Sequence, residues 1–225
     1  MLRNRLRPAF VRLGDCAENP HKRYACGARR GGRVVECGGG VLEVRPFSCE
    51  ADYGHMIDYF LQADKTFLIS MGVDPRKLPD KKEWLERLLP DLERSDYEKQ
   101  TYFLSWLYSG RNIGHSNVNK IKYGNEAYLH LHIWVPKYRK VGMGIEFLRE
   151  SANTFIRKFA LQSLYCEPNA DNPAPNRILS KLGFRFIKRY RTVPALINFA
   201  QDVNRYVIQH EIAGTKNVDI KIGER

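Results

Sequence analysis

The chain has 225 residues, of which 43% are hydrophobic and 12% aromatic, so it can bury one sizeable core, and one domain is the default expectation. No stretch approaches the roughly 18 apolar residues of a membrane helix, and the N-terminus lacks the apolar segment of a secretory signal. We therefore expect a soluble, cytoplasmic protein without a membrane partner.

The formal charge of +12 is unevenly distributed. Residues 1–40 carry nine Lys/Arg and three Asp/Glu, whereas residues 41–225 carry 28 and 22. Half of the excess positive charge therefore lies in less than a fifth of the chain. A basic nucleic-acid-binding module, with aromatic residues interleaved over residues 185–191, is one alternative. Alternating Phe, Ile and Tyr there equally fit a half-buried strand, so nucleic acid is not the expected partner.

The five cysteines show no paired short spacing of the zinc type, and an odd number cannot all pair with one another. We expect free thiols in a reducing compartment and no bound metal.

Residues 1–40 combine Arg-rich runs and three glycine clusters with almost no periodic apolar pattern, so nothing there offsets the entropy cost of ordering. Three interpretations stay open: a disordered basic arm, an amphipathic organelle-targeting leader at residues 1–13, or residues translated from upstream of the natural start. The last is favoured because the composition changes abruptly at Val41. We expect a disordered basic leader over residues 1–40, outside the natural protein, and a folded domain over residues 41–225.

From Val41 onward the predicted elements alternate in type. A strand at residues 41–45 is followed by a helix from Ser48 to about residue 63, and a second helix begins at Asp80, whose spacing to Glu83 fits a capping box. Strands at residues 101–108, 113–121 and 128–135 follow, separated by turn residues at 109–112 and 122–125. These three strands predict an antiparallel meander.

The rest of the chain predicts a helix at residues 145–160, a short strand at 163–166 and a short helix at 175–182 that Gly183 ends. Two more strands follow at 184–190 and 205–210. The sum is an α/β protein with a mostly antiparallel sheet of about seven strands, flanked by helices and broken by one strand–helix–strand crossover.

The run Arg139-Lys140-Val141-Gly142-Met143-Gly144 lies between an apolar strand and an amphipathic helix. Glycines let backbone N–H groups approach a phosphate closely, and the following helix N-terminus adds its positive dipole end. Arg139 and Lys140 would reinforce an anion site. The third glycine of a Rossmann fingerprint and the Gly-Lys-Ser/Thr of a P-loop are both missing.

At this junction the sequence resembles the GNAT superfamily of acetyltransferases, whose acetyl-CoA loop has the form Arg/Gln-x-x-Gly-x-Gly/Ala. Residues 172–184 are similar to the Asn-x-x-Ser-x-x-x-Leu-x-Lys-x-Gly-Phe segment of the ribosomal-protein N-terminal acetyltransferase branch, with Pro175 in place of its Ser. The resemblance covers about residues 41–210. It implies a GNAT fold and transfer of an acetyl group from acetyl-CoA to an amine acceptor, by a monomer or a homodimer.

The resemblance also implies roles for particular residues. Backbone groups of Trp134 and Val135 would bind the pantetheine arm and polarise the thioester carbonyl, and Asn172 would hydrogen-bond the pantetheine. The full set that the resemblance places at the cofactor is Trp134, Val135, Arg139, Lys140, Val141, Gly142, Met143, Gly144, Asn172 and Arg177.

Acetyl transfer needs a neutral amine that attacks and a proton for the departing thiolate. Leu179 occupies the position at which many GNAT enzymes carry a tyrosine acid. The proton must then come from Tyr165, Cys166, Tyr190 or solvent, or transfer proceeds without a dedicated acid.

For the base, His130 and His132 are the first candidates, because they share one face of the strand that leads into the loop and histidine titrates near neutrality. The alternative is that both only pack against or hydrogen-bond the neighbouring strand, as we expect of His115. Glu126 is a further candidate, although a charged strand end is usually only solvated.

The acceptor stays open. The His-x-His strand and the run Cys166-Glu167-Pro168-Asn169 are similar to siderophore-type hydroxylysine N-acyltransferases, which would imply a small amine. The ribosomal-protein branch would imply a protein N-terminus. A third hypothesis keeps the fold without the catalysis: with Leu179 at the acid position, the chain could bind acyl-CoA as a sensor.

Overall fold

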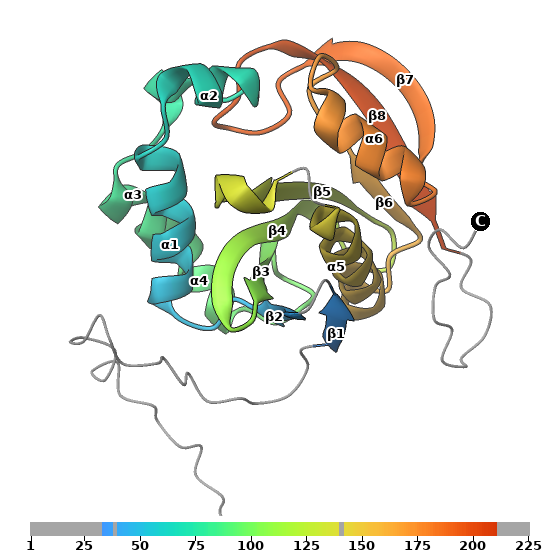
Figure 1. Cartoon of the computed structure of the whole chain (residues 1–225). Coiled ribbons are helices and arrows are strands. Elements are labelled where there is room, and N and C mark those ends of the chain that lie inside the picture. The colour runs from blue at the N-terminus through green and yellow to red at the C-terminus, as the bar shows by residue number, and fades with distance from the viewer. Residues whose placement is uncertain (1–32, 38–39, 140–141, 211–225) are drawn as a thin grey trace, which may run out of the picture. The chain divides into compact units, whose positions relative to one another are not determined.

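The computed structural model describes residues 33–37, 40–139 and 142–210 (Figure 1). Within them, one eight-stranded sheet forms in the order β1-β2-β3-β4-β5-β6-β8-β7. The strands are β1 (Arg33–Cys37), β2 (Gly40–Pro46), β3 (Thr101–Tyr108), β4 (Arg111–Lys122), β5 (Glu126–Ile133), β6 (Ser163–Cys166), β7 (Arg185–Thr192) and β8 (Gln201–Gln209). Among these described strands, only β5 and β6 pair in parallel. The α/β class and the mostly antiparallel sheet are confirmed.

Strand β1 begins before the expected domain boundary at residue 40. It pairs antiparallel with β2 over Arg33–Cys37, inside the range for which we expected no structure. The sequence Val34-Val35 favours a strand, and the paired partner strand supplies the hydrogen bonds that an isolated segment would lack. The remainder of the expected leader lies outside the described residues.

The segment between β2 and β3 holds four α-helices where we expected two. They are α1 (Glu50–Leu61), α2 (Lys65–Ser70), α3 (Lys81–Leu88) and α4 (Pro90–Glu93), with a 3-10 turn at Pro75–Lys77. Asp64 begins α2 by accepting a hydrogen bond from the Thr66 amide, and Asp80 begins α3 by accepting from the Glu83 amide. A carboxylate cap of this kind satisfies an otherwise unpaired N–H at the helix start.

The two faces of the sheet carry separate apolar clusters. Helix α5 (Met143–Phe159) packs on one face, where Trp106 of β3 stacks on Phe147 with ring centroids 5.0 Å apart. Helices α1 and α3 cover part of the other face, where Phe60 and Trp84 lie in one cluster with Phe103 of β3. Helix α6 (Pro173–Lys181) lies beside β7 and β8 in Figure 1.

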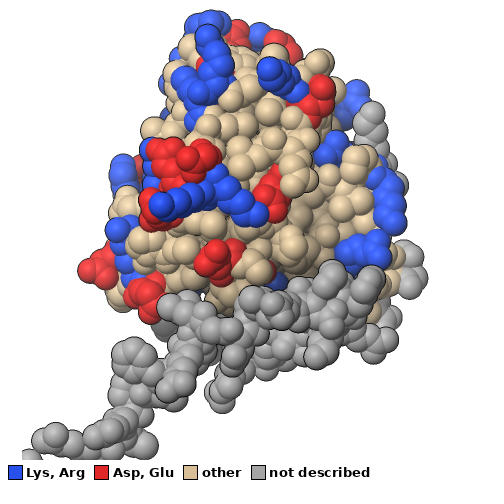
Figure 2. All heavy atoms as spheres, turned by 90° about the vertical axis from the view of Figure 1, so that its left-hand side faces the viewer, with Lys and Arg blue, Asp and Glu red and all other residues tan. Residues whose placement is uncertain are grey.

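No helix in the described part of the chain is both long and apolar enough to cross a membrane. On the face that Figure 2 shows, basic and acidic side chains intermingle. Ion pairs such as Lys81–Asp58 and Arg87–Glu83 account for part of this pattern on α1 and α3. This face therefore offers no single basic surface for nucleic acid.

Candidate active site

Strands β5 and β6 diverge and leave a fork in the sheet. They pair only over Glu126–Leu129 and Ser163–Cys166, whereas β5 continues to Ile133 along β4. After Cys166 the chain stays with β8, because the Asn204 amide donates to the Pro168 carbonyl at 3.1 Å and the Ala170 amide donates to the Asp202 carbonyl at 2.9 Å. One edge of β5 beyond Leu129 is thus left without a neighbouring strand.

Alternation along β5 decides which backbone groups face the fork. The Trp134 amide donates to the Ile113 carbonyl of β4 at 2.8 Å, and the Val135 amide approaches the same oxygen at 3.4 Å. Because successive residues of a strand point their amides to opposite edges, Leu131 and Ile133 direct theirs toward the fork. The amides of Trp134 and Val135 thus face β4, and the expectation that backbone groups of these two residues bind the cofactor stays a prediction.

The glycine loop after β5 leads directly into α5. Gly142 has a φ of +87° and precedes the first helical residue, and no side chain caps the first turn of α5. Gly144 is buried, and a Cβ there would lie 3.5 Å from the side chains of Ile133 and Ile178. The first-turn N–H groups of α5 are therefore free of side-chain caps at the end of the fork. Met143 packs against the core, and Lys140 and Val141 lie outside the described residues.

Arg139 is held by the end of β5. Its Nε donates to the Ile133 carbonyl at 2.9 Å and its Nη2 to the Trp134 carbonyl at 3.2 Å. The guanidinium also lies 4.4 Å from the centre of the Phe67 ring of α2. Its side chain thus connects the strand end with α2, and its expected contact with an anion stays a prediction.

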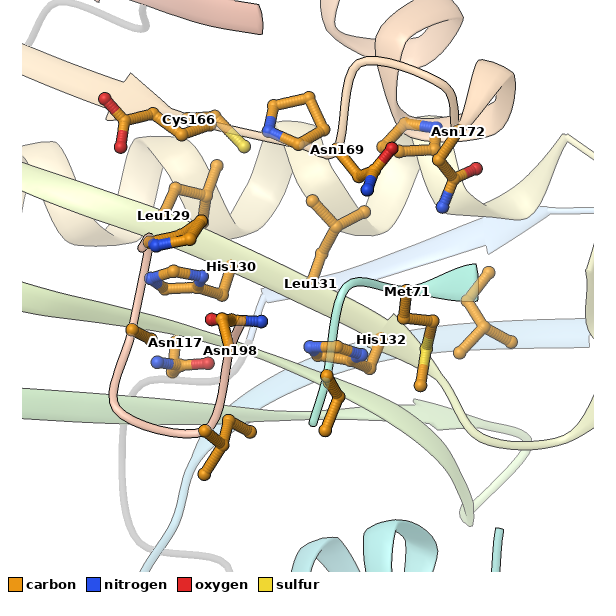
Figure 3. Close-up of a pocket in the computed structure, with 18 of the residues that line it drawn as sticks. Met71, Asn117, Leu129, His130, Leu131, His132, Cys166, Asn169, Asn172 and Asn198 are labelled. Carbon is orange, nitrogen blue, oxygen red and sulfur yellow. The ribbon is translucent and has the colours of Figure 1, made fainter. Parts of the chain in front are cut away.

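A cavity of about 550 Å³ opens beside the fork. Its walls come from β4, β5, the segment after β6, the start of α6, helices α1 and α2, and the loop before β8. Figure 3 shows His130 and His132 projecting from the same side of β5 into this cavity. A volume of this size is typical of sites for small molecules.

The histidines of this wall are uncharged at neutral pH. Burial lowers the pKa of His130 to about 4, with a further lowering by Lys120 that Glu167 opposes. Burial lowers the pKa of His132 to about 3, helped by His130 and Arg139. Burial also holds the pKa of His115 well below its ordinary value. An imidazole without its proton can accept one from a substrate.

The three rings differ in their partners. His115 accepts a hydrogen bond at its Nδ1 from the Trp134 indole at 2.8 Å, and its ring stacks on His132 with centroids 5.0 Å apart. These contacts fit the packing role expected of His115, which also lines the cavity. Nε2 of His130 is buried and has no hydrogen-bond partner among the described residues. Nε2 of His130 is therefore available to accept a proton.

The model for the acetyltransferase (GNAT) domain matches residues 42–185, which is more than half of the chain. The chain belongs to the GNAT acetyltransferase family. This confirms the family that the glycine loop and the segment at residues 172–184 indicate, together with its reaction, transfer of an acetyl group from acetyl-CoA to an amine.

Solved structures of other GNAT proteins share the fold at low sequence identity. RimL, a ribosomal L7/L12 alpha-N-protein acetyltransferase in complex with coenzyme A, is 14% identical at a TM-score of 0.62, covering 79% of this chain and 98% of that one. Ribosomal-protein-S5-alanine acetyltransferase from Vibrio fischeri is 15% identical at a TM-score of 0.62, and the match covers 79% of this chain and 96% of that one. Spermidine N-acetyltransferase from Vibrio cholerae is 17% identical at a TM-score of 0.60, and the match covers 75% of this chain and 95% of that one. No curated protein matches the sequence significantly.

Two of the expected catalytic residues lie away from the cavity of this GNAT domain. Glu126 is at the start of β5, four residues before His130, and pairs with Lys122 at 2.6 Å. Four residues of strand span about 13 Å. Tyr165 stacks on Tyr128 with centroids 5.3 Å apart. Neither side chain lines the cavity, so the structure does not bring them to the reacting groups.

The other proton donors are also constrained. Cys166 lines the cavity, but burial raises the pKa of its thiol to about 12. Tyr190 donates its hydroxyl to Glu167, and burial raises its pKa to about 12. Leu179 is fully buried in the core on the α5 side of the sheet. The GNAT domain thus carries no dedicated acid at the position of the usual tyrosine.

The start of α6 forms one rim of the cavity. Asn172 lines it and caps the helix, accepting a hydrogen bond from the Ala174 amide at 3.3 Å. Its expected contact with pantetheine stays a prediction. Arg177 is exposed on α6 and does not line the cavity.

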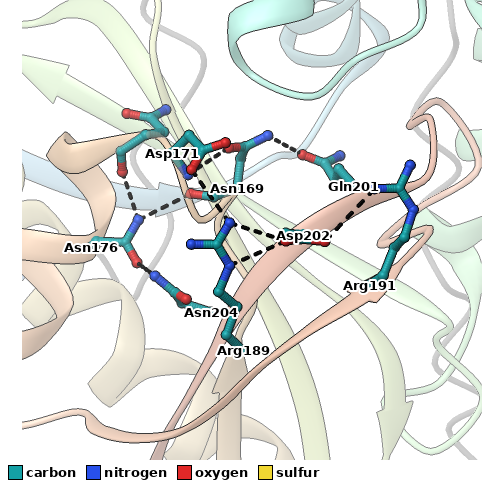
Figure 4. Close-up of polar contacts among 9 residues, drawn as sticks. Asn169, Asp171, Asn176, Arg189, Arg191, Gln201, Asp202 and Asn204 are labelled. Carbon is teal, nitrogen blue, oxygen red and sulfur yellow. Dashed lines mark hydrogen bonds and ion pairs between the residues drawn. The ribbon is translucent and has the colours of Figure 1, made fainter.

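Amide side chains fix this rim to the rest of the fold (Figure 4). Asn169 donates to the Gln201 side chain at 2.6 Å, and Gln201 donates in turn to the Gly72 carbonyl after α2 at 2.9 Å. Asn204 and the Asn169 carbonyl both bond Asn176 of α6. The network therefore connects the segment after β6 with the end of α2 across the start of β8.

Sequence reasoning missed a second polar and aromatic layer of the cavity. Asn117 faces the same side of β4 as His115 and pairs in register with His130. Phe67 comes from α2, a helix that was not predicted. The period-two alternation of Asn117 with His115 was the available signal, whereas nothing local in the sequence marks Phe67.

Proposed function

We propose that the fork between β5 and β6 holds the pantetheine arm of acetyl-CoA. The observation that carries this proposal is the edge of β5 at Leu131 and Ile133, which has no neighbouring strand and leads to a first turn of α5 that no side chain caps. An extended amide-containing chain can pair with such an edge as a strand would. The positive end of the α5 dipole then suits the pyrophosphate.

The cofactor fits the residues present. Gly142 is exposed at the helix start, and the space where its side chain would stand is open, so a phosphate can approach the backbone there. The Leu131 amide, directed toward the fork, is our candidate for polarising the thioester carbonyl in place of Trp134 and Val135.

We assign the role of general base to His130. The amine nitrogen attacks the thioester carbonyl carbon, the carbon–sulfur bond breaks, and the amine proton passes to Nε2 of His130. The nitrogen of the tetrahedral adduct is far more acidic than a free ammonium, so a histidine with a pKa of about 4 can accept its proton. The thiolate then takes a proton from the imidazolium or from solvent, which removes the need for a tyrosine at position 179.

Amide hydrogen exchange with and without coenzyme A tests the location of the cofactor. We expect the ligand to slow exchange at Leu131, Ile133, Met143 and Gly144, because these N–H groups gain acceptors. Exchange at the β3–β4 turn around Gly110 should stay unchanged. Protection confined to other segments would contradict the fork as the pantetheine site.

A further inference from the structure

Part of the cavity wall is built of aromatic rings from α1, α2 and β5. We call Tyr59, Phe60, Phe67 and His132, which all line the cavity, its acceptor end. Tyr59 meets Phe60 edge to face with centroids 4.9 Å apart, and Phe60 meets His132 in the same way at 5.1 Å. Tyr59 meets Phe67 edge to face at 6.3 Å. Such an array is preorganised to accept one more ring.

The acceptor end already contains a positive charge. The Arg139 guanidinium lies 4.4 Å from the centre of the Phe67 ring. The pKa of His132 is lowered mainly by burial, then by His130, and also by Arg139. The face of the Phe67 ring, which could attract a cation from a substrate, is therefore already occupied by Arg139. A second ammonium group at this end would be repelled.

The carboxylates that could compensate are committed elsewhere. Among the described residues that line the cavity, only Glu167 and Asp171 are acidic. Glu167 is 2.5 Å from Arg205, and Asp171 is 3.6 Å from Arg189. Both lie in the segment after β6, and neither is part of the acceptor end. Apart from Arg139, the other polar side chains on the wall are neutral: they are amides, histidines, the hydroxyls of Ser70 and Tyr59, and the Cys166 thiol.

The available volume limits the size of the acceptor. The cavity of about 550 Å³ includes the side of the fork that the proposed pantetheine arm would fill. Only part of it remains for the amine.

We infer that the acceptor is a small primary amine that carries an uncharged aromatic group close to its nitrogen, and that polyamines are rejected. This inference rests on the proposed function. The aromatic group would pack among the rings of Tyr59, Phe60 and Phe67, and the amine would point toward His130.

A panel of amines tests the inference with the full chain and acetyl-CoA, following release of the coenzyme A thiol. We expect 2-phenylethylamine to exceed 2-cyclohexylethylamine in kcat/KM by about two- to tenfold, the range of one aromatic pair. Spermidine should be poorer than 2-phenylethylamine by at least about tenfold, because a charge must then be buried without a partner. A peptide with an N-terminal phenylalanine completes the panel.

Two variants test the aromatic wall and the positive charge separately. Phe67→Leu should remove the preference for 2-phenylethylamine over 2-cyclohexylethylamine. Tyr97 is an exposed aromatic residue that does not line the cavity, so Tyr97→Leu should keep this preference. Arg139→Gln introduces the other residue that the family loop has at this position. It should raise kcat/KM for spermidine relative to that for 2-phenylethylamine.

Spermidine or the peptide as the best acceptor, or no transfer to 2-phenylethylamine, would overturn the inference. Binding of coenzyme A, measured separately by calorimetry, would still support the proposed cofactor site in either case. Failure to bind coenzyme A would instead refute the proposed function itself.

Discussion

Replacing Gly142 with glutamate is expected to abolish coenzyme A binding, with a loss of at least about a hundredfold in affinity. Gly142 has a φ of +87° at the start of α5, so any side chain strains the loop. A glutamate there also fills the open space in front of the first-turn amides and sets a negative charge against the pyrophosphate. Isothermal titration calorimetry of the variant with coenzyme A measures the effect.

Gly110→Glu is the matched control. Gly110 also has a positive φ, +74°, with open space around its Cβ position, but it lies in the β3–β4 turn and does not line the cavity. It therefore reproduces the backbone strain and the added charge away from the loop. Equal coenzyme A affinity in the two variants would show that Gly142 has no special part in binding.

Replacing His130 with glutamine is expected to lower kcat by about a hundredfold or more while coenzyme A affinity stays the same, since general bases typically contribute 10²–10⁴-fold. His132→Gln should instead raise KM for the amine, because the His132 ring packs against Phe60 at the acceptor end. Steady-state kinetics of both variants with the best amine separate the two roles. Unchanged kcat in His130→Gln would remove it as the base.

The pH dependence provides a second measure of His130. Its pKa of about 4 places the enzyme's own acidic limb near pH 4, once kcat/KM is corrected for the fraction of free amine. A limb near 6.5 that His130→Gln abolishes would show that the imidazole titrates normally. A limb that the variant leaves unchanged would show that another group is the base.

The lowered pKa of His130 should also make the folded protein less stable as the pH decreases. The unfolded chain binds a proton at His130 below about pH 6.5, whereas the folded protein does not bind it until about pH 4. The free energy of unfolding should therefore fall as the pH decreases through this window, by at most about 1.4 kcal/mol per pH unit for this residue. Chemical denaturation at pH 7 and pH 5 should show a smaller fall for His130→Gln than for the wild type.

Local chemistry predicts most of the sheet. The meander of β3, β4 and β5 follows from turn residues around Gly110 and Gly124, both of which have positive φ, and the predicted bounds of β3 and β6 match the structure. Helix α2 was missed although Asp64 caps it, because six residues give no clear apolar period. Strand β1 was missed because its order depends on pairing with β2 rather than on its own composition.

The site was predictable where a motif specifies backbone shape, and less so where it depends on tertiary contacts. The loop at Gly142 and the inward face of His130 follow from glycine chemistry and strand alternation. The direction of the Trp134 amide depends on its register with Ile113, and the position of the Arg139 side chain depends on Phe67 of α2. Neither contact leaves a trace in the local sequence.

A crystal structure of the full chain with coenzyme A would test the central claim most directly. We predict that the pantetheine arm lies between residues 131–133 of β5 and the segment after Cys166. The pyrophosphate should lie on the amides at the start of α5, and the thiol should lie near His130. Coenzyme A bound elsewhere, with the fork between β5 and the segment after Cys166 still empty, would contradict the proposed cofactor site.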